Sequence, residues 1–167
     1  TQLRLTASIG ISQYPEDGLN FDALFRHAGL AVGQCKASGR NRSLRFNPAL
    51  ELRAQEDLSL EQDLRRALNE NLLSVHYQPI VDGRSGRPVS LEALVRWQHP
   101  QQGFISPERF VGLAEQHGFV AELDTWVARR ACADLVGLLE EGHDLRMAVN
   151  CSALNLANDQ LPGRIEQ

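Results

Sequence analysis

The sequence has few of the features that assign a protein to a specialised class at once. Its 167 residues include only three cysteines and no Cys-x-x-Cys pair, which excludes a disulfide scaffold and a cysteine-rich zinc site. Every apolar run is shorter than the ~18 residues that span a bilayer. The first residues are polar and β-prone, unlike those of a signal peptide. This composition is typical of a globular protein, for which we expect a cytoplasmic location.

Basic residues are scarce in the larger part of the chain. Residues 1–50 carry a net charge of +3, and residues 51–167 carry a net charge of −7. The acidic larger part argues against nonspecific binding to DNA or RNA. The asymmetry indicates two structural units rather than one. The five histidines show no i,i+4 metal spacing, so we interpret them as structural or surface residues.

Periodicity and turn residues predict an alternation of strands and helices. Strands are expected at 3–11, 43–46, 73–80, 89–97 and 147–150, and helices at 21–37, 49–71, 107–116, 121–141 and from 154 onward. The helix at 49–71 would serve as a linker and as the first helix of the second unit. Such an alternation predicts an α/β fold with a parallel sheet or barrel.

The strand expected at 89–97 carries two opposite charges. Because side chains alternate along a strand, Glu92, Leu94 and Arg96 share one face, and the other face is wholly apolar. A carboxylate can hold a hard divalent cation, and a guanidinium can hold a phosphate. The alternative is a solvated strand face with a weak surface ion pair.

Polar residues also occur near the ends of the expected strands. Gln78, Arg96 and Asn150 lie at carboxyl ends, where chemistry collects in α/β folds, and Glu92 lies on the Arg96 face. We expect the four side chains to converge. The alternatives are that Asn150 is an ordinary turn residue and that Gln78 satisfies a backbone group beside a proline.

The order of these motifs resembles two bacterial signalling modules that occur in tandem. Residues 1–47 resemble the last part of a GGDEF (diguanylate cyclase) domain through 6–11, 14–18 and 35–41. The remainder resembles the opening part of an EAL domain through 77–80, 92–97, 105–110, 113–115 and 149–152. We therefore divide the chain into a degenerate GGDEF part (1–47), a linker helix with the start of the EAL domain (48–71), and the N-terminal part of the EAL domain (72–167).

The EAL resemblance implies a modified TIM-type (β/α) barrel that hydrolyses cyclic di-GMP to linear pGpG with two Mg²⁺ or Mn²⁺ ions. By this resemblance Glu92 is a catalytic residue and a metal ligand, and Asn150 is a second metal ligand. Gln78, Leu94 and Arg96 would contact the dinucleotide, with Arg96 on a phosphate. Oxygen ligands of this kind suit hard cations.

The GGDEF resemblance implies a weaker, altered site. Lys36 and Arg40 match positions that contact GTP phosphates, and their i,i+4 spacing predicts a shared helix face. Gly29 and Gly33 stand inside the helix where the family has a more helix-prone pattern. This difference suggests a degenerate cyclase domain that regulates rather than synthesises.

The resemblance leaves the barrel incomplete in this chain. A TIM-type barrel needs roughly 200 residues or more, and the later EAL motifs lie outside the sequence. We expect the 167-residue chain alone to be inactive and its complete parent protein to be the phosphodiesterase.

The resemblance also implies a homodimer, an upstream sensor domain, and a parent protein that other segments could anchor to the inner membrane. Two alternatives to an enzyme are a catalytically inactive cyclic di-GMP receptor or protein-interaction module, and a purely structural remnant.

Overall fold

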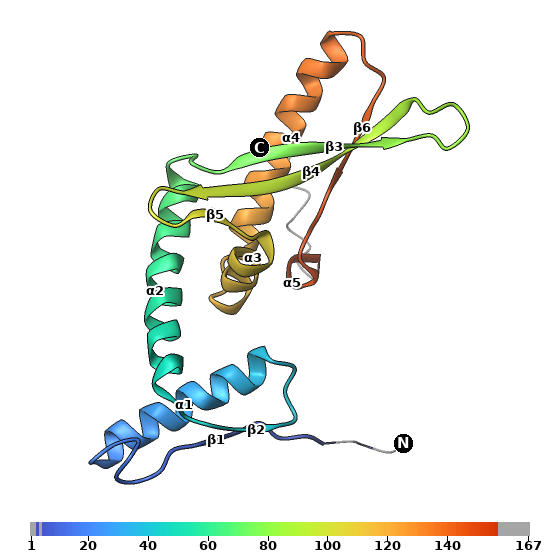
Figure 1. The fold of residues 1–167 in the computed structure, drawn as a ribbon. Coiled ribbons are helices and arrows are strands. Elements are labelled where there is room, and N and C mark those ends of the chain that lie inside the picture. The colour runs from blue at the N-terminus through green and yellow to red at the C-terminus, as the bar shows by residue number, and fades with distance from the viewer. Residues whose placement is uncertain (1–2, 4, 157–167) are drawn as a thin grey trace. The chain divides into compact units, whose positions relative to one another are not determined.

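The computed structural model describes residue 3 and residues 5–156. It divides into two compact units, Thr1–Ser59 and Leu60–Gln167, and the helix α2 (Pro48–Asn69) contains the division (Figure 1). No helix in the described part of the chain is long and apolar enough to cross a membrane.

The first unit is a β-α-β arrangement followed by the start of α2. Strands β1 (Ile9–Ile11) and β2 (Ser43–Arg45) pair in parallel, and α1 (Phe21–Ala37) connects them. The predicted bounds of α1 are confirmed, and the side-chain oxygen of Asn20 caps the helix by accepting a hydrogen bond from the Ala23 N–H at 2.9 Å. The strand predicted over 3–11 is shorter, because β2 offers only three residues to pair with.

The carboxyl end of α1 changes the interpretation of Lys36 and Arg40. Lys36 lies in the last turn of the helix, but Arg40 lies beyond it. The backbone N–H of Arg40 donates to the Cys35 carbonyl at 2.9 Å, and Gly39 and Arg40 have φ values of +97° and +60°. This left-handed helix termination turns the chain, so the prediction that the two basic residues share a helix face is wrong.

Two glycines in the interior of α1 give a stability prediction. A Cβ added at Gly29 or Gly33 would meet nothing within 4 Å. Replacing each with alanine should therefore raise the free energy of unfolding of the first unit by roughly 0.5–1 kcal/mol. Chemical denaturation of the wild-type protein and the double variant measures the change.

Gly10→Ala is the matched control for this prediction. A Cβ at Gly10 would approach the Ala28 carbonyl oxygen to 2.1 Å, so this substitution should destabilise the same unit. A lower stability for the Gly29→Ala, Gly33→Ala variant would contradict the assignment of both positions to open helix surface.

The second unit contains a mixed sheet rather than the parallel sheet expected from the sequence. Its strands are β3 (Ser74–Val81), β4 (Pro88–His99), β5 (Gly103–Ile105) and β6 (Arg146–Val149). Strand β4 pairs antiparallel with β3 and β5 and parallel with β6. The reason for the antiparallel hairpin is local: the Asp82 carboxylate accepts hydrogen bonds from two backbone N–H groups of the β3–β4 turn.

Helices cover one face of this sheet. They are the end of α2, α3 (Pro107–Gln116) and α4 (Val120–Glu140), and Figure 1 shows α4 crossing β3 and β4. Trp97 of β4 is 2% exposed and meets the Phe110 ring edge-to-face at 5.8 Å. Other buried members of this core include Leu60, Leu64, Leu113, Phe119 and Leu123. The strand face that is wholly apolar in the sequence, which includes Ala93 and Trp97, is therefore buried in this core.

Candidate functional site

The register of the sheet places the predicted site residues on its other face. Gln78 of β3 lies directly opposite Glu92 of β4, and Glu92 lies opposite Ala148 of β6. Residues that pair across strands point to the same side, so Gln78, Glu92, Leu94 and Arg96 share the face opposite Trp97. The alternation predicted from the sequence is therefore present in the structure.

Asn150 joins this face from a distant part of the chain. It follows β6 immediately, and its Nδ2 donates to Glu92 Oε1 at 2.8 Å across a separation of 58 residues. The parallel pairing of β4 with β6 causes this contact, because it carries the carboxyl end of β6 alongside β4. The structure thus brings together the two residues predicted as metal ligands, and their roles stay predictions.

Gln78 reaches the site in a different way from the one expected. Strand β3 continues to Val81, so Gln78 lies in the strand interior rather than at its carboxyl end. Because β3 runs antiparallel to β4, its carboxyl end lies away from that of β4. The strand-end argument for Gln78 is wrong, and cross-strand pairing with Glu92 places it instead. The same argument is wrong for Arg96, because β4 continues to His99.

Arg96 and Leu94 border a cavity beside the Glu92–Asn150 pair. The cavity has a volume of about 230 Å³. Asn150 also lines it, together with Ala93 and Val95 from the other face of β4 and residues of α3 and α4. The half-buried Arg96 guanidinium donates to the Val95 carbonyl at 2.9 Å. In the described part of the chain, Glu92 bonds to Asn150 and Arg96 to the Val95 carbonyl, and no ion pair joins Glu92 to Arg96.

A buried carboxylate that lines this cavity was not identified from the sequence. Asp124 of α4 is 9% exposed, and its Oδ2 accepts hydrogen bonds from groups of Cys151, Ser152 and Asn155. Burial and the nearby Asp124 raise the pKa of the Cys151 thiol to about 11, so the thiol stays protonated at neutral pH. The signal in the sequence was a charged residue next to Leu123 within the apolar stripe of α4.

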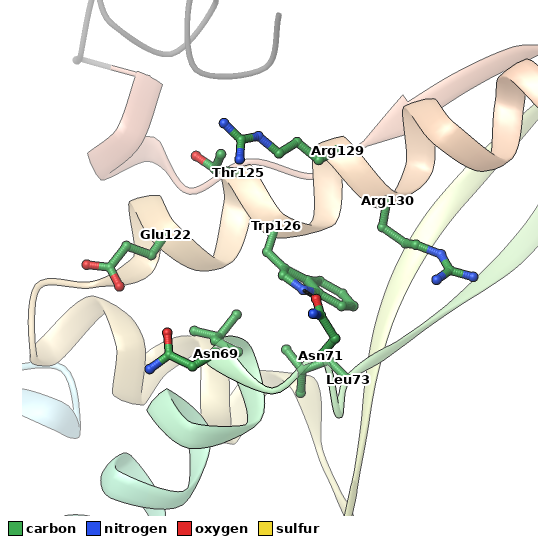
Figure 2. Close-up of a pocket in the computed structure, with 9 residues that line it drawn as sticks. Asn69, Asn71, Leu73, Glu122, Thr125, Trp126, Arg129 and Arg130 are labelled. Carbon is green, nitrogen blue, oxygen red and sulfur yellow. Dashed lines mark hydrogen bonds between the residues drawn. The ribbon is translucent and has the colours of Figure 1, made fainter. Parts of the chain in front are cut away.

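A larger cavity, with a volume of about 680 Å³, lies between α4 and the turn from α2 to β3. Figure 2 shows side chains that line it. Trp126 Nε1 donates to Asn71 Oδ1 at 2.8 Å, and Arg130 Nε donates to Asp134 Oδ2 at 3.0 Å. These polar groups bond to one another, and we assign them a structural role.

His99 illustrates the structural role predicted for the histidines. It is 3% exposed, and its Nδ1 accepts hydrogen bonds from the backbone N–H groups of Gln101 and Gln102. Its Nε2 therefore carries the proton and donates to Asp63 Oδ2 at 3.0 Å. This ring secures the β4–β5 turn.

Glu92 and Asn150 offer the kind of ligand atom that a hard divalent cation prefers, but too few ligand atoms to complete its coordination. A carboxylate and an amide oxygen are ligands that Mg²⁺ and Mn²⁺ prefer. Since Asn150 donates through Nδ2, its Oδ1 and the second oxygen of Glu92 are left for a cation. Within residues 3 and 5–156, no group of three or more His, Cys, Asp or Glu side chains is placed to hold a metal ion. The pair can therefore supply two of the ligands, and other groups must supply the rest.

Comparison with known sequence families gives one match that covers most of the second unit. A profile described as EAL domain matches residues 61–167. The match does not include residues 1–60, so the resemblance of residues 1–47 to a GGDEF domain stays a prediction.

Two curated proteins of Pseudomonas aeruginosa align with nearly the whole chain. Cyclic di-GMP phosphodiesterase NbdA is 50% identical over 160 residues, which cover 95% of this chain and 20% of that protein. Bifunctional diguanylate cyclase/cyclic di-GMP phosphodiesterase MucR is 42% identical over 158 residues, which cover 94% of this chain and 23% of that protein. The chain thus spans about a fifth of the length of these relatives.

A solved structure shows the same fold. The PaMucR phosphodiesterase in its c-di-GMP complex superposes with a TM-score of 0.61 at 41% identity, and the superposition covers 65% of this chain and 44% of that one. The α/β fold of this chain therefore matches part of an EAL TIM-type barrel.

Proposed function

The chain belongs to the EAL domain family, and from this premise we propose that it forms part of a metal-dependent phosphodiesterase that hydrolyses cyclic di-GMP to linear pGpG. The main support is the contact between Glu92 and Asn150 on a sheet face that also carries Gln78, Leu94 and Arg96. Similarity to named cyclic di-GMP phosphodiesterases supports the same substrate.

The roles of the individual residues follow from their chemistry. Glu92 and Asn150 would hold one of two Mg²⁺ or Mn²⁺ ions, which when bound would activate water and neutralise charge on the phosphodiester. Arg96 offers a planar guanidinium with paired donors for a phosphate oxygen. Leu94, between the two charged residues on the strand, offers an apolar surface to the dinucleotide, and the exposed Gln78 offers amide donors and an acceptor.

We also propose that residues 1–47 are the last part of a degenerate GGDEF domain. The alignment with the bifunctional protein MucR, over 94% of this chain, supports this assignment. Lys36 and Arg40 would contact GTP phosphates from the carboxyl end of α1 rather than from one helix face. Formation of a homodimer and the presence of an upstream sensor domain stay predictions.

Incubation of the full-length protein with cyclic di-GMP tests the main proposal. With Mg²⁺ or Mn²⁺ present we expect linear pGpG to accumulate, and we expect a chelator to stop the reaction because the metal carries the chemistry. Chromatography of the nucleotides provides the measurement. Tight nucleotide binding without turnover in saturating metal would favour the receptor alternative, and absence of both binding and turnover would contradict the proposal.

A further inference from the structure

Asn150 lies where the strand pairing ends. The last register pair of β4 and β6 is Ala93 with Val149, so Asn150 is the first residue beyond this ladder. The chain that follows forms only the four-residue helix α5 (Ala153–Leu156) within the described residues. A ligand residue on such a segment needs a neighbouring group to fix its position.

The buried carboxylate of Asp124 provides this fixation. Its Oδ2 accepts a hydrogen bond from the Ser152 backbone N–H at 3.0 Å, from Cys151 Sγ at 3.3 Å and from Asn155 Nδ2 at 3.0 Å. Asp124 and Asn155 are 9% and 3% exposed, so water competes little for these bonds. One carboxylate oxygen thereby holds both residues that directly follow Asn150.

A hydrogen bond to α3 holds the same segment, because the Ser152 hydroxyl donates to Glu115. The Ser152 carbonyl also accepts the Asn155 N–H at 2.9 Å, which closes a local turn. The helices α3 and α4 both belong to the core that packs on Trp97. The segment that follows Asn150 is thus held by the helix layer as well as by its connection to β6.

We propose that Asp124 is a positioning residue for Asn150. Asp124 sets where the Asn150 amide lies beside Glu92, and it thereby sets the affinity of the site for a metal ion. The inference rests on the proposed function, because it assumes that Glu92 and Asn150 hold a cation. A loop-borne ligand that shifts by a fraction of an ångström loses coordination geometry, and outer partners of metal ligands typically change metal affinity or activity 10–100-fold.

The chain offers a matched control on the same helix. Asp134 of α4 also accepts a hydrogen bond from the sheet, from the Tyr77 hydroxyl at 2.5 Å. It lies near the other end of α4, and its carboxylate bonds to Tyr77 and Arg130 rather than to the segment after Asn150. Loss of Asp134 should reduce stability without any change at the metal site.

The experiment compares Asp124→Ala, Asp124→Asn and Asp134→Ala in the full-length protein. Mn²⁺ binding is titrated by electron paramagnetic resonance without nucleotide, and the metal concentration for half-maximal hydrolysis is measured separately. We expect Asp124→Ala to weaken Mn²⁺ binding by about 10–100-fold and Asp124→Asn, which keeps an acceptor oxygen, to weaken it less. Asp134→Ala should lower only the unfolding temperature.

The outcomes separate this inference from the proposed function. A wild-type protein that neither binds Mn²⁺ nor hydrolyses cyclic di-GMP would overturn the proposed function and this inference with it. A functional wild type whose Asp124 variants bind Mn²⁺ as tightly as Asp134→Ala would overturn the positioning role alone. If Asp124→Ala does not fold, Asp124→Asn decides the question, and an unchanged Mn²⁺ affinity in that variant would refute the inference.

Discussion

Replacement of Glu92 with alanine should reduce hydrolysis of cyclic di-GMP by about 10³-fold or more. The expected size follows from the several kcal/mol by which a bound metal stabilises a phosphoryl transition state, at about 1.4 kcal/mol per tenfold in rate. Glu92 supplies the only carboxylate of the pair, and its partner Asn150 would remain as a neutral ligand. Single-turnover kinetics in the full-length protein at saturating Mg²⁺ measures the loss.

Two further variants make the Glu92 prediction specific. Glu92→Gln keeps the shape of the side chain and an acceptor for Asn150 Nδ2, but it removes the charge that attracts a cation, so it should lose nearly as much activity. Glu108→Gln alters an exposed carboxylate in the first turn of α3 and should hydrolyse at the wild-type rate. Full activity in Glu92→Ala would contradict the assignment of this face as the active site.

Trp97→Ala should destabilise the second unit by about 3–5 kcal/mol, the range expected for removal of a large aromatic side chain from a core. The indole is 2% exposed and contacts Phe110 edge-to-face at 5.8 Å and His99 at 5.3 Å. Its removal leaves a cavity that the surrounding helices can fill only in part. Equilibrium unfolding in urea, followed by far-ultraviolet circular dichroism, gives the change in free energy.

Phe104→Ala is the control for the core prediction. Phe104 lies on β5, the short strand that pairs with β4 beside Trp97, and it is 59% exposed. Its truncation should change the free energy of unfolding by less than about 0.5 kcal/mol. Similar unfolding midpoints for the two variants would refute the placement of Trp97 at the centre of the core.

Helices with clear local boundaries were predicted well from the sequence. The bounds expected for α1 and α3 agree with the structure. Residues at the ends of each helix, such as Asn20 and Pro107, begin or end it through interactions within a single helical turn, so a local pattern is enough to locate them. Ser106 takes the cap position of α3 without a side-chain hydrogen bond, so the proline in the first turn is sufficient to begin this helix.

The relative direction of β3 and β4 and the existence of β5 could not be predicted in the same way. The alternation of elements favoured a parallel sheet, yet the turn from Asp82 to Gly86 makes β3 and β4 an antiparallel hairpin. Strand β5 has three residues and exists only because it pairs with Trp97–His99 of β4. A segment this short carries no periodicity of its own.

The site shows the same limit of sequence reasoning. The alternation that groups Glu92, Leu94 and Arg96 is local to one strand and could be predicted. The role inferred for Asp124 depends on partners 27 to 31 residues away, which no local pattern specifies. Only the packing of α4 against the chain after β6 brings these groups together.

The separation between Glu92 and Asn150 also orders the assembly of the site during synthesis. Gln78 and Glu92 meet within one hairpin, a structure that forms in about 1–10 μs. Asn150 follows Glu92 by 58 residues, which a ribosome adds in roughly 3–12 s at about 5–20 residues per second. A nascent chain therefore presents Glu92 without Asn150 for seconds, and the proposed pair of metal ligands would form only after β6 has emerged.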